Sequence, residues 1–149
     1  AVEEVIAEAI TRLKKRIPSA SISVSMPDDL ILAPMDPTLI EQVLINLMEN
    51  AIKYNRPGGQ VWITVGEQGD DMLVRVKDNG VGIPKESLDR IFERFYRVDK
   101  GRSRKQGGTG LGLSIVKHIV NFYHGTIHVT SELDKGTEFT VTIPLDMHK

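Results

Sequence analysis

Three stretches of the chain carry apolar residues at the three- and four-residue spacing of an amphipathic helix. They predict helices from Val2 to Ile17, from Pro37 to about Tyr54, and from Thr109 to Tyr123. Asp36 is expected to cap the second helix, because an aspartate before a proline at the first helical position accepts an unpaired backbone N–H. A shorter helix is expected at Lys85–Phe92.

The ends and the buried face of these helices are also predictable. Pro18 stops the first helix, Arg56–Gly59 ends the second, and Gly125 follows the third as glycine commonly does at a helix C-terminus. The side chains that the second helix should bury are Leu39, Ile40, Val43, Leu44, Leu47 and Ile52.

Alternation of apolar and polar residues predicts short strands between the helices. The segments are 22–24 (half-buried), 30–32, 60–65, 72–77, 126–131 and 137–144. Turns over Gly66–Asp71 and around Asp134–Gly136 join neighbouring strands into hairpins. Together these elements predict helices on one face of a mixed β-sheet, an α/β two-layer sandwich. Residues 99–108 are polar and basic, and we expect a mobile loop there.

The composition is that of one globular domain. A chain of 149 residues predicts a single unit over 1–149. The net charge of −1 argues against binding nucleic acid through overall charge. The chain has no cysteine, which excludes a disulfide framework and a thiolate metal site. No apolar run approaches the length of a membrane span.

An asparagine-containing segment closes the second predicted helix. Asn46 and Asn50 lie one helical turn apart and project from the same face. Their amide oxygens are hard ligands suited to Mg²⁺. Lys53 is suited to meeting a phosphate, and Tyr54 offers its ring to a nucleotide. The alternative is a helix with a polar solvent face, although asparagine is a poor helix former.

A first glycine cluster, Asp78–Pro84, follows a predicted strand. A carboxylate at that strand end can accept a hydrogen bond from the exocyclic amine of adenine, which guanine lacks at that position. Gly80 and Gly82 permit positive φ and a close approach of the backbone to the base. Taken alone, Asp78 fits an ordinary Asn-Gly turn with a solvated carboxylate better, and it is the two partner motifs that favour the nucleotide-binding interpretation.

A second glycine cluster, 107–113, opens the third long helix. Backbone N–H groups at a helix start form an anion site, and Gly108, Gly110 and Gly112 would allow phosphate to approach closely. A flexible linker is the alternative, but it does not explain glycines inside an apolar helical pattern. Arg97 lies beside the expected mobile loop and is suited to reaching a terminal phosphate.

Phe92 and Phe95 are interpreted as hydrophobic anchors of that loop. The four histidines lack the spacing of metal ligands and are expected to be structural or exposed: His118, His124, His128 and His148.

This set of motifs resembles the ATP-binding catalytic domain of bacterial sensor histidine kinases, with the Bergerat fold shared with DNA gyrase B, Hsp90 and MutL. The resemblance covers almost the whole chain. Asn46–Tyr54 is similar to the N box, Asp78–Gly82 to the G1 box, Phe92–Phe95 to the F box and Gly108–Gly112 to the G2 box, and Gly136–Phe139 resembles a late glycine motif.

The resemblance implies a function for each box. Asp78 would bind the adenine amine, Asn50 would hold Mg²⁺ with help from Asn46, and residues 97–108 would form a lid over ATP. The implied catalytic residues are Asn46, Asn50, Lys53 and Arg97. The implied nucleotide contacts are Asn50, Lys53, Tyr54, Asp78, Gly80, Gly82, Ile83, Gly108, Thr109, Gly110, Leu111, Gly112 and Thr137.

The phosphoacceptor motif of that family, a histidine followed by an acidic residue and later a proline, is absent. We therefore expect the C-terminal ATP-handling part of a longer sensor kinase, cytoplasmic, without membrane insertion of its own and monomeric in isolation. The implied partners are a dimerisation domain that carries the acceptor histidine and, indirectly, a response regulator. The segment 27–44 also resembles potassium-responsive sensor kinases.

Three alternatives stay open at this point. A hydrolase of the gyrase or Hsp90 type is disfavoured, because its water-activating glutamate is replaced by Asn46, whose amide cannot take a proton. A serine kinase of the anti-sigma-factor type resembles those hydrolases in carrying that glutamate. A non-enzymatic nucleotide-binding module is the third.

Overall fold

The computed structural model describes residues 1–16, 21–26, 35–53, 55, 59–93 and 112–145. Several predicted features lie outside these residues: the strand at 30–32, Tyr54, Phe95, Arg97, the loop at 99–108, the glycine-box residues 108–111 and His148.

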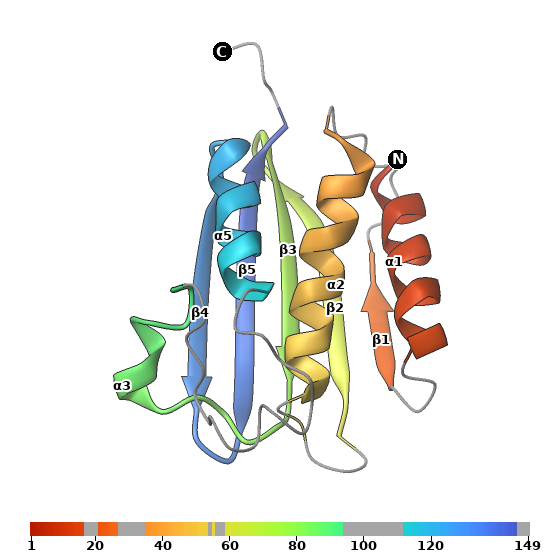
Figure 1. Ribbon diagram of the computed structural model, residues 1–149. Coiled ribbons are helices and arrows are strands. Elements are labelled where there is room, and N and C mark those ends of the chain that lie inside the picture. Colours follow the sequence, from red (N-terminus) through yellow and green to blue (C-terminus); the bar gives the residue numbers. More distant parts are fainter. Residues whose placement is uncertain (17–20, 27–34, 54, 56–58, 94–111, 146–149) are drawn as a thin grey trace.

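The described chain forms one five-stranded mixed sheet in the order β1-β2-β3-β5-β4 (Figure 1). The strands are β1 (Ile22–Ser25), β2 (Val61–Gln68), β3 (Asp71–Asp78), β4 (Thr126–Glu132) and β5 (Gly136–Pro144). β1 runs parallel to β2, and the other neighbours are antiparallel. The mixed sheet of the predicted α/β sandwich is thereby confirmed.

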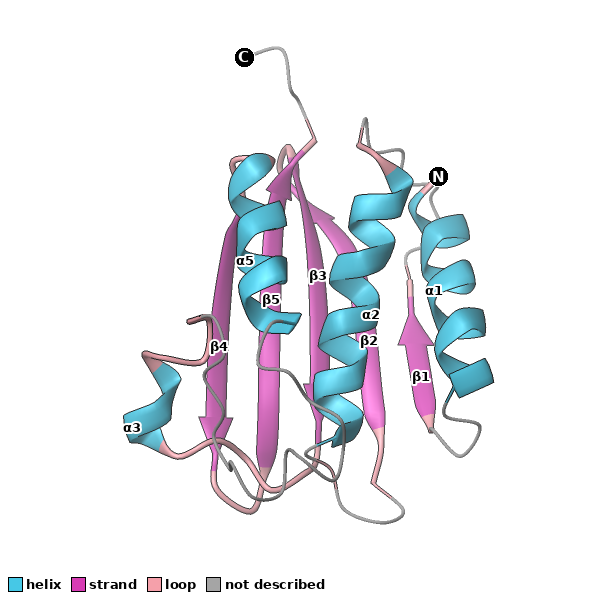
Figure 2. Cartoon of the chain, viewed as in Figure 1, coloured by secondary structure: helices cyan, strands magenta, loops and turns pink. Residues whose placement is uncertain are grey.

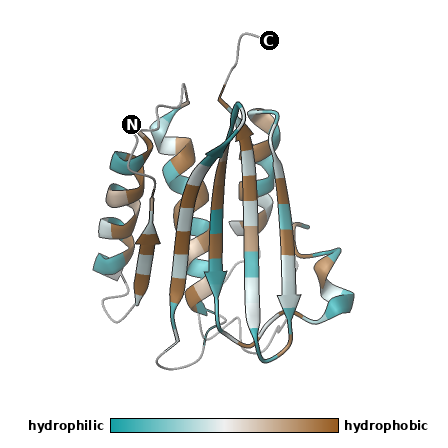
Figure 3. Ribbon diagram, turned by 180° about the vertical axis from the view of Figure 1, so that it is seen from behind, coloured by the Kyte–Doolittle hydropathy of each residue, from teal (hydrophilic) through white to brown (hydrophobic). Residues whose placement is uncertain are grey.

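Within the described residues, three long helices pack on one face of this sheet (Figure 2). They are α1 (Val2–Arg16), α2 (Pro37–Lys53) and α5 (Gly112–Phe122), and a four-residue helix, α3 (Lys85–Leu88), follows β3. Seen from behind, the other face of the sheet is crossed by no described helix (Figure 3). The two-layer arrangement predicted from the sequence is therefore correct.

The core lies between α2 and the inner face of the sheet. One row of this face runs through Ile63, Val76 and Phe139, which are paired across β2, β3 and β5 and are at most 1% exposed. From α2, the buried side chains are Ile40, Val43, Leu44, Leu47, Met48 and Ala51. Leu39 and Ile52 were expected to be buried but are only partly so. Full burial of each large apolar side chain contributes about 1.5–3 kcal/mol.

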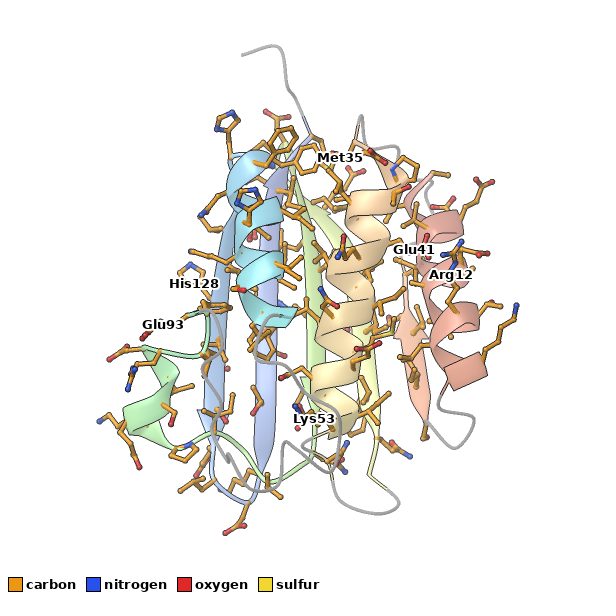
Figure 4. All side chains as sticks on the ribbon, viewed as in Figure 1. Arg12, Met35, Glu41, Lys53, Glu93 and His128 are labelled. Carbon is orange, nitrogen blue, oxygen red and sulfur yellow. The ribbon has the colours of Figure 1, made fainter. Side chains whose placement is uncertain are left out.

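The start of α2 is fixed as its sequence predicts. The Thr38 N–H donates to the Asp36 carboxylate over 2.9 Å, so Asp36 is the N-cap and Pro37 the first helical residue. The backbone N–H of Asp36 donates to the Tyr123 hydroxyl over 2.9 Å, which ties the start of α2 to the end of α5. On the other side of α2, Arg12 of α1 pairs with Glu41 over 2.9 Å (Figure 4).

The β2–β3 hairpin is longer than predicted. Residues 66–68 were assigned to a turn, but they continue β2 and pair with β3, as Gly66 with Leu73 and Gln68 with Asp71. The turn itself is only Gly69 and Asp70, with Gly69 at φ +61°. Polar residues at a hairpin tip retain ladder hydrogen bonds, so their polarity did not mark the strand end.

Three further details differ from the predictions. Val24 in β1 is 41% exposed, because β1 is an edge strand. α3 ends at Leu88, and turns linked by Arg90 N–H to Ser87 O and Glu93 N–H to Arg90 O replace its predicted second half. α5 ends at Phe122, one residue before the predicted Tyr123, and His124 takes a left-handed φ of +60° before Gly125.

Candidate functional site

The predicted nucleotide-binding residues of the described chain gather at one end of the sandwich. α2 ends there, β3 ends there and β5 begins there, with the start of α5 directed to the same end (Figure 1). Asn46, Asn50 and Lys53 are on the C-terminal half of α2, and Asp78 is the last residue of β3. Figure 4 shows Lys53 at this end of α2.

Asn46 joins the N-box helix to the glycine-box helix. Its Nδ2 donates to the carbonyl oxygen of Gly112 over 3.4 Å. A Cβ added to Gly112 would lie 3.9 Å from Asn46, an ordinary contact, so packing among the described residues does not require glycine at this position. Glycine there is compatible with the predicted approach of a phosphate.

Asp78 is a buried carboxylate, with 3% of its surface exposed. The Gly80 N–H donates to its Oδ1 over 2.9 Å. Burial raises the pKa of Asp78, and the backbone amides of Gly80 and Thr137 act in the opposite direction by stabilising the charge. No lysine or arginine of the described residues is paired with it. A buried acidic group with no cationic partner within the described ranges is a candidate binding group.

The turn after Asp78 is held against the β4–β5 hairpin. Gly82 has φ +79°, and a Cβ there would collide with the backbone carbonyl of Glu132. The positive φ expected for Gly82 is therefore correct, and the close approach is to the protein's own backbone. Gly80 could tolerate a positive φ but does not adopt one, and it is buried. Its N–H is instead used to hold Asp78.

Ile83 and Thr137 are brought to the same place, and both are buried. Thr137 pairs directly with Asp78 in the β3–β5 ladder. The Ile83 N–H donates to the hydroxyl of Ser131 on β4 over 2.7 Å. Ser131 was not singled out from the sequence. It is a polar residue on the inward face of β4, which it shares with Ile127 and Val129.

A family model described as histidine kinase-, DNA gyrase B- and HSP90-like ATPase matches residues 35–147. The chain belongs to this ATPase family. Relatives and solved structures agree with the assignment. The sensor histidine kinase WalK of Bacillus subtilis (strain 168) is 46% identical over 122 residues, which cover 80% of this chain and 20% of WalK. The chain thus spans about a fifth of the length of such curated relatives.

Two solved structures are similar to this ATPase domain. The mycobacterial sensor histidine kinase MprB has a TM-score of 0.84 at 27% identity, covering 96% of this chain and 95% of the other. Full-length ShkA, solved in complex with AMPPNP, has a TM-score of 0.81 at 27% identity, covering 97% of this chain and 30% of the other. The fold is that of histidine-kinase catalytic domains, as expected.

Phe92 anchors the chain of this ATPase domain just before residues 94–111. Its ring meets that of Phe139 edge-on at 6.3 Å between centroids. The Lys117 ammonium from α5 lies 5.9 Å from the Phe92 centroid on the ring face. Phe92 is therefore attached to both the sheet and α5, which agrees with its interpretation as a hydrophobic anchor.

The remaining predictions about the described residues concern metal sites and membranes. No group of three or more His, Cys, Asp or Glu side chains in the described ranges could hold a metal ion. His118, His124 and His128 are exposed. Within the same ranges, the helices are too short or too polar to cross a bilayer.

Proposed function

We propose that this chain binds ATP and donates its γ-phosphate to a histidine on a separate dimerisation domain, as the catalytic part of a two-component sensor kinase. The observation that carries the proposal is Asp78, a buried carboxylate held by backbone N–H groups at a strand end of a histidine-kinase ATPase fold. The names of the relatives support the reaction class, since WalK and MprB are described as sensor histidine kinases.

Asp78 would select adenine. One carboxylate oxygen accepts the Gly80 N–H, which fixes the orientation of the carboxylate plane. An ionised carboxylate only accepts hydrogen bonds, so it pairs with the adenine amine and opposes the carbonyl that guanine carries at the equivalent position. The AMPPNP complex of ShkA shows an adenine nucleotide in a related protein of the same fold.

Asn50, with help from Asn46, would hold Mg²⁺, and Lys53 would meet a phosphate. Amide oxygens suit Mg²⁺, which typically keeps water and phosphate oxygens as its other ligands. This fits a described chain without a cluster of acidic or histidine ligands. When bound, the ion would neutralise charge on the phosphates of ATP. Asn46 and its contact with Gly112 would also keep the N box against the start of α5.

The roles of Tyr54, Arg97 and residues 108–111 remain predictions: a nucleotide contact, a phosphate contact and an anion site. We further propose that residues 1–149 are one domain of a longer, membrane-anchored sensor protein and lie in the cytoplasm as a monomer. Its partners would be the acceptor-histidine domain and, through that domain, a response regulator. The similarity to relatives several times as long as this chain supports this arrangement.

Asn46 supports phosphotransfer over hydrolysis. The gyrase-type mechanism needs a carboxylate at this position to take a proton from water, whereas Asn46 donates its amide N–H to Gly112. The described helix α2 therefore offers an amide where a hydrolase has its base.

Titration calorimetry with MgATP, MgGTP and adenosine tests the nucleotide assignment. We expect binding of MgATP and adenosine, and much weaker binding of MgGTP. Asp71→Asn is the matched control for Asp78→Asn, because Asp71 is on the same strand as Asp78 but at its other end. Equal affinity for MgATP and MgGTP, or no binding of either, would contradict the proposal.

A further inference from the structure

Three polar residues interrupt the apolar inner face of the sheet at its nucleotide end. Asp78 on β3 pairs with Thr137 on β5, and Thr137 pairs with Ser131 on β4. Along β5 the inward positions that follow Thr137 are Phe139, Val141 and Ile143, all buried. The polar row therefore stands where the pattern of the strands calls for apolar side chains.

We propose that Ser131 is a positioning residue for nucleotide binding: its hydroxyl locks the Asp78–Ile83 turn onto the β4–β5 hairpin and so holds the Asp78 carboxylate in place. The inference rests on the proposed role of Asp78 in binding ATP. Ser131 is assigned no contact with the nucleotide, and it acts through Thr137 and Ile83.

The hydroxyl of Ser131 contacts three partners. Its Oγ accepts the Ile83 N–H at 2.7 Å, lies 3.1 Å from the Gly136 carbonyl oxygen and lies 2.8 Å from Thr137 Oγ1. A serine hydroxyl has one donor and two acceptor positions. All three contacts are satisfied together when Ser131 donates to Gly136 and accepts from both Ile83 and Thr137. The one donor and both acceptor positions of the hydroxyl are then occupied.

These contacts enclose Asp78 from two sides. On one side, Thr137 is the ladder partner of Asp78, and its backbone amide stabilises the carboxylate charge. On the other side, Ile83 closes the turn whose Gly80 N–H binds Asp78 Oδ1. Ser131 is the side-chain link between the two, because it reaches both Thr137 and Ile83.

Backbone contacts make the turn and the hairpin fit closely, but they leave the Ile83 end dependent on Ser131. The Asp134 N–H donates to the Val81 carbonyl over 2.9 Å. Glycine is required at Gly82 and Gly136, where a Cβ would collide with backbone carbonyls of Glu132 and Asp78 respectively. Removing the Ser131 hydroxyl would leave the buried Ile83 N–H without its acceptor, which favours a shift of the turn.

The test compares Ser131→Ala with Ser131→Thr, which keeps the hydroxyl. Thr130→Ala is the matched control, because Thr130 is the exposed neighbour on the same strand. We expect Ser131→Ala to weaken adenosine and MgATP binding about threefold to tenfold, the loss that follows from one partly buried hydrogen bond. Ser131→Thr and Thr130→Ala should stay within about twofold of the wild type. If Ser131→Ala does not fold, Ser131→Cys, with its weaker donor and acceptor, replaces it.

A double-mutant cycle with Asp78→Asn separates positioning from general destabilisation. If Ser131 acts through Asp78, adding Ser131→Ala to Asp78→Asn should cause almost no further loss of affinity. Faster hydrogen exchange at the Ile83 and Gly80 amides of Ser131→Ala is expected as well. Wild-type affinity in Ser131→Ala with only a lower melting temperature, or fully additive losses, would overturn the inference. Absence of ATP binding by the wild type would instead refute the proposed function, and the exchange rates would still decide whether Ser131 holds the turn.

Discussion

Asp78→Asn is expected to weaken adenine binding without weakening the fold. The change keeps the shape of the side chain and an oxygen that can accept the Gly80 N–H. It removes the negative charge and turns one acceptor into an N–H₂ group, which would face the adenine amine as a second donor. The substitution should therefore weaken binding of the adenine base without destabilising the sheet.

The magnitude follows from the type of bond lost. A hydrogen bond to a charged group contributes about 1.5–3 kcal/mol, which corresponds to a loss of affinity of about tenfold to 150-fold. The stability effect has the opposite sign. Burial raises the pKa of Asp78, so the folded protein binds that proton more tightly than the unfolded chain. Stability is lost as pH rises from the ordinary aspartate range through the raised pKa, and above it the buried charge is a cost that asparagine removes.

The assay pairs calorimetric titration of adenosine with thermal denaturation of the same samples at neutral pH. The melting temperature of Asp78→Asn should equal or exceed that of the wild type, while its affinity for adenosine falls at least tenfold. In the wild type, adenosine affinity should also fall on acidification, beginning above the ordinary pKa range of an aspartate, and the variant should lack this dependence. Unchanged affinity in Asp78→Asn would refute the assignment of the adenine contact, and a loss explained by partial unfolding would refute the stability argument.

Three further changes test separate parts of the account. Asn50→Ala should weaken MgATP binding more than adenosine binding in parallel titrations, because Asn50 is assigned to the metal and the base is assigned to Asp78; equal losses would contradict that division. His124→Gly should raise the free energy of unfolding by about 1 kcal/mol in a urea titration, since His124 has a left-handed φ of +60° that glycine adopts without strain. Gly136→Ala should lower the free energy of unfolding by about 1–3 kcal/mol and weaken ATP binding, because Gly136 has a φ of +129° and a Cβ there would collide with the Asp78 carbonyl. Wild-type stability and affinity in this variant would show that the turn adapts.

Local chemistry explains which parts of the fold the sequence could predict. The cap at Asp36 and Pro37 depends on neighbouring residues only, and it was located correctly. Gly125 was correctly predicted to follow α5, but the sequence did not show which residue takes the left-handed position. His124 takes the left-handed position, with His124 N–H bonded to Asn121 O and Gly125 N–H to Val120 O. Gly125 is needed for a tertiary reason, because a Cβ there would collide with the Thr142 carbonyl.

In the candidate site, too, local sequence features could be predicted, whereas contacts between distant segments could not. Asp78 was identified because a carboxylate, a strand end and a glycine turn are contiguous in the sequence. Ser131 was missed because its partner Ile83 is 48 residues away, and only the folded sheet brings them together. The one local sign was a serine at an inward strand position, which is too common to indicate a role by itself.

Transfer of phosphate to a histidine is the decisive test of the proposed kinase function. The domain is mixed with ATP labelled at the γ-phosphate and with a separate protein that carries the dimerisation helices and acceptor histidine of a sensor kinase. We expect acid-labile label on that histidine, none when the histidine is replaced, and very slow release of phosphate by the domain alone, since Asn46 cannot act as a base for water. Rapid phosphate release by the domain alone, or acid-stable label on a serine of a partner, would contradict that function.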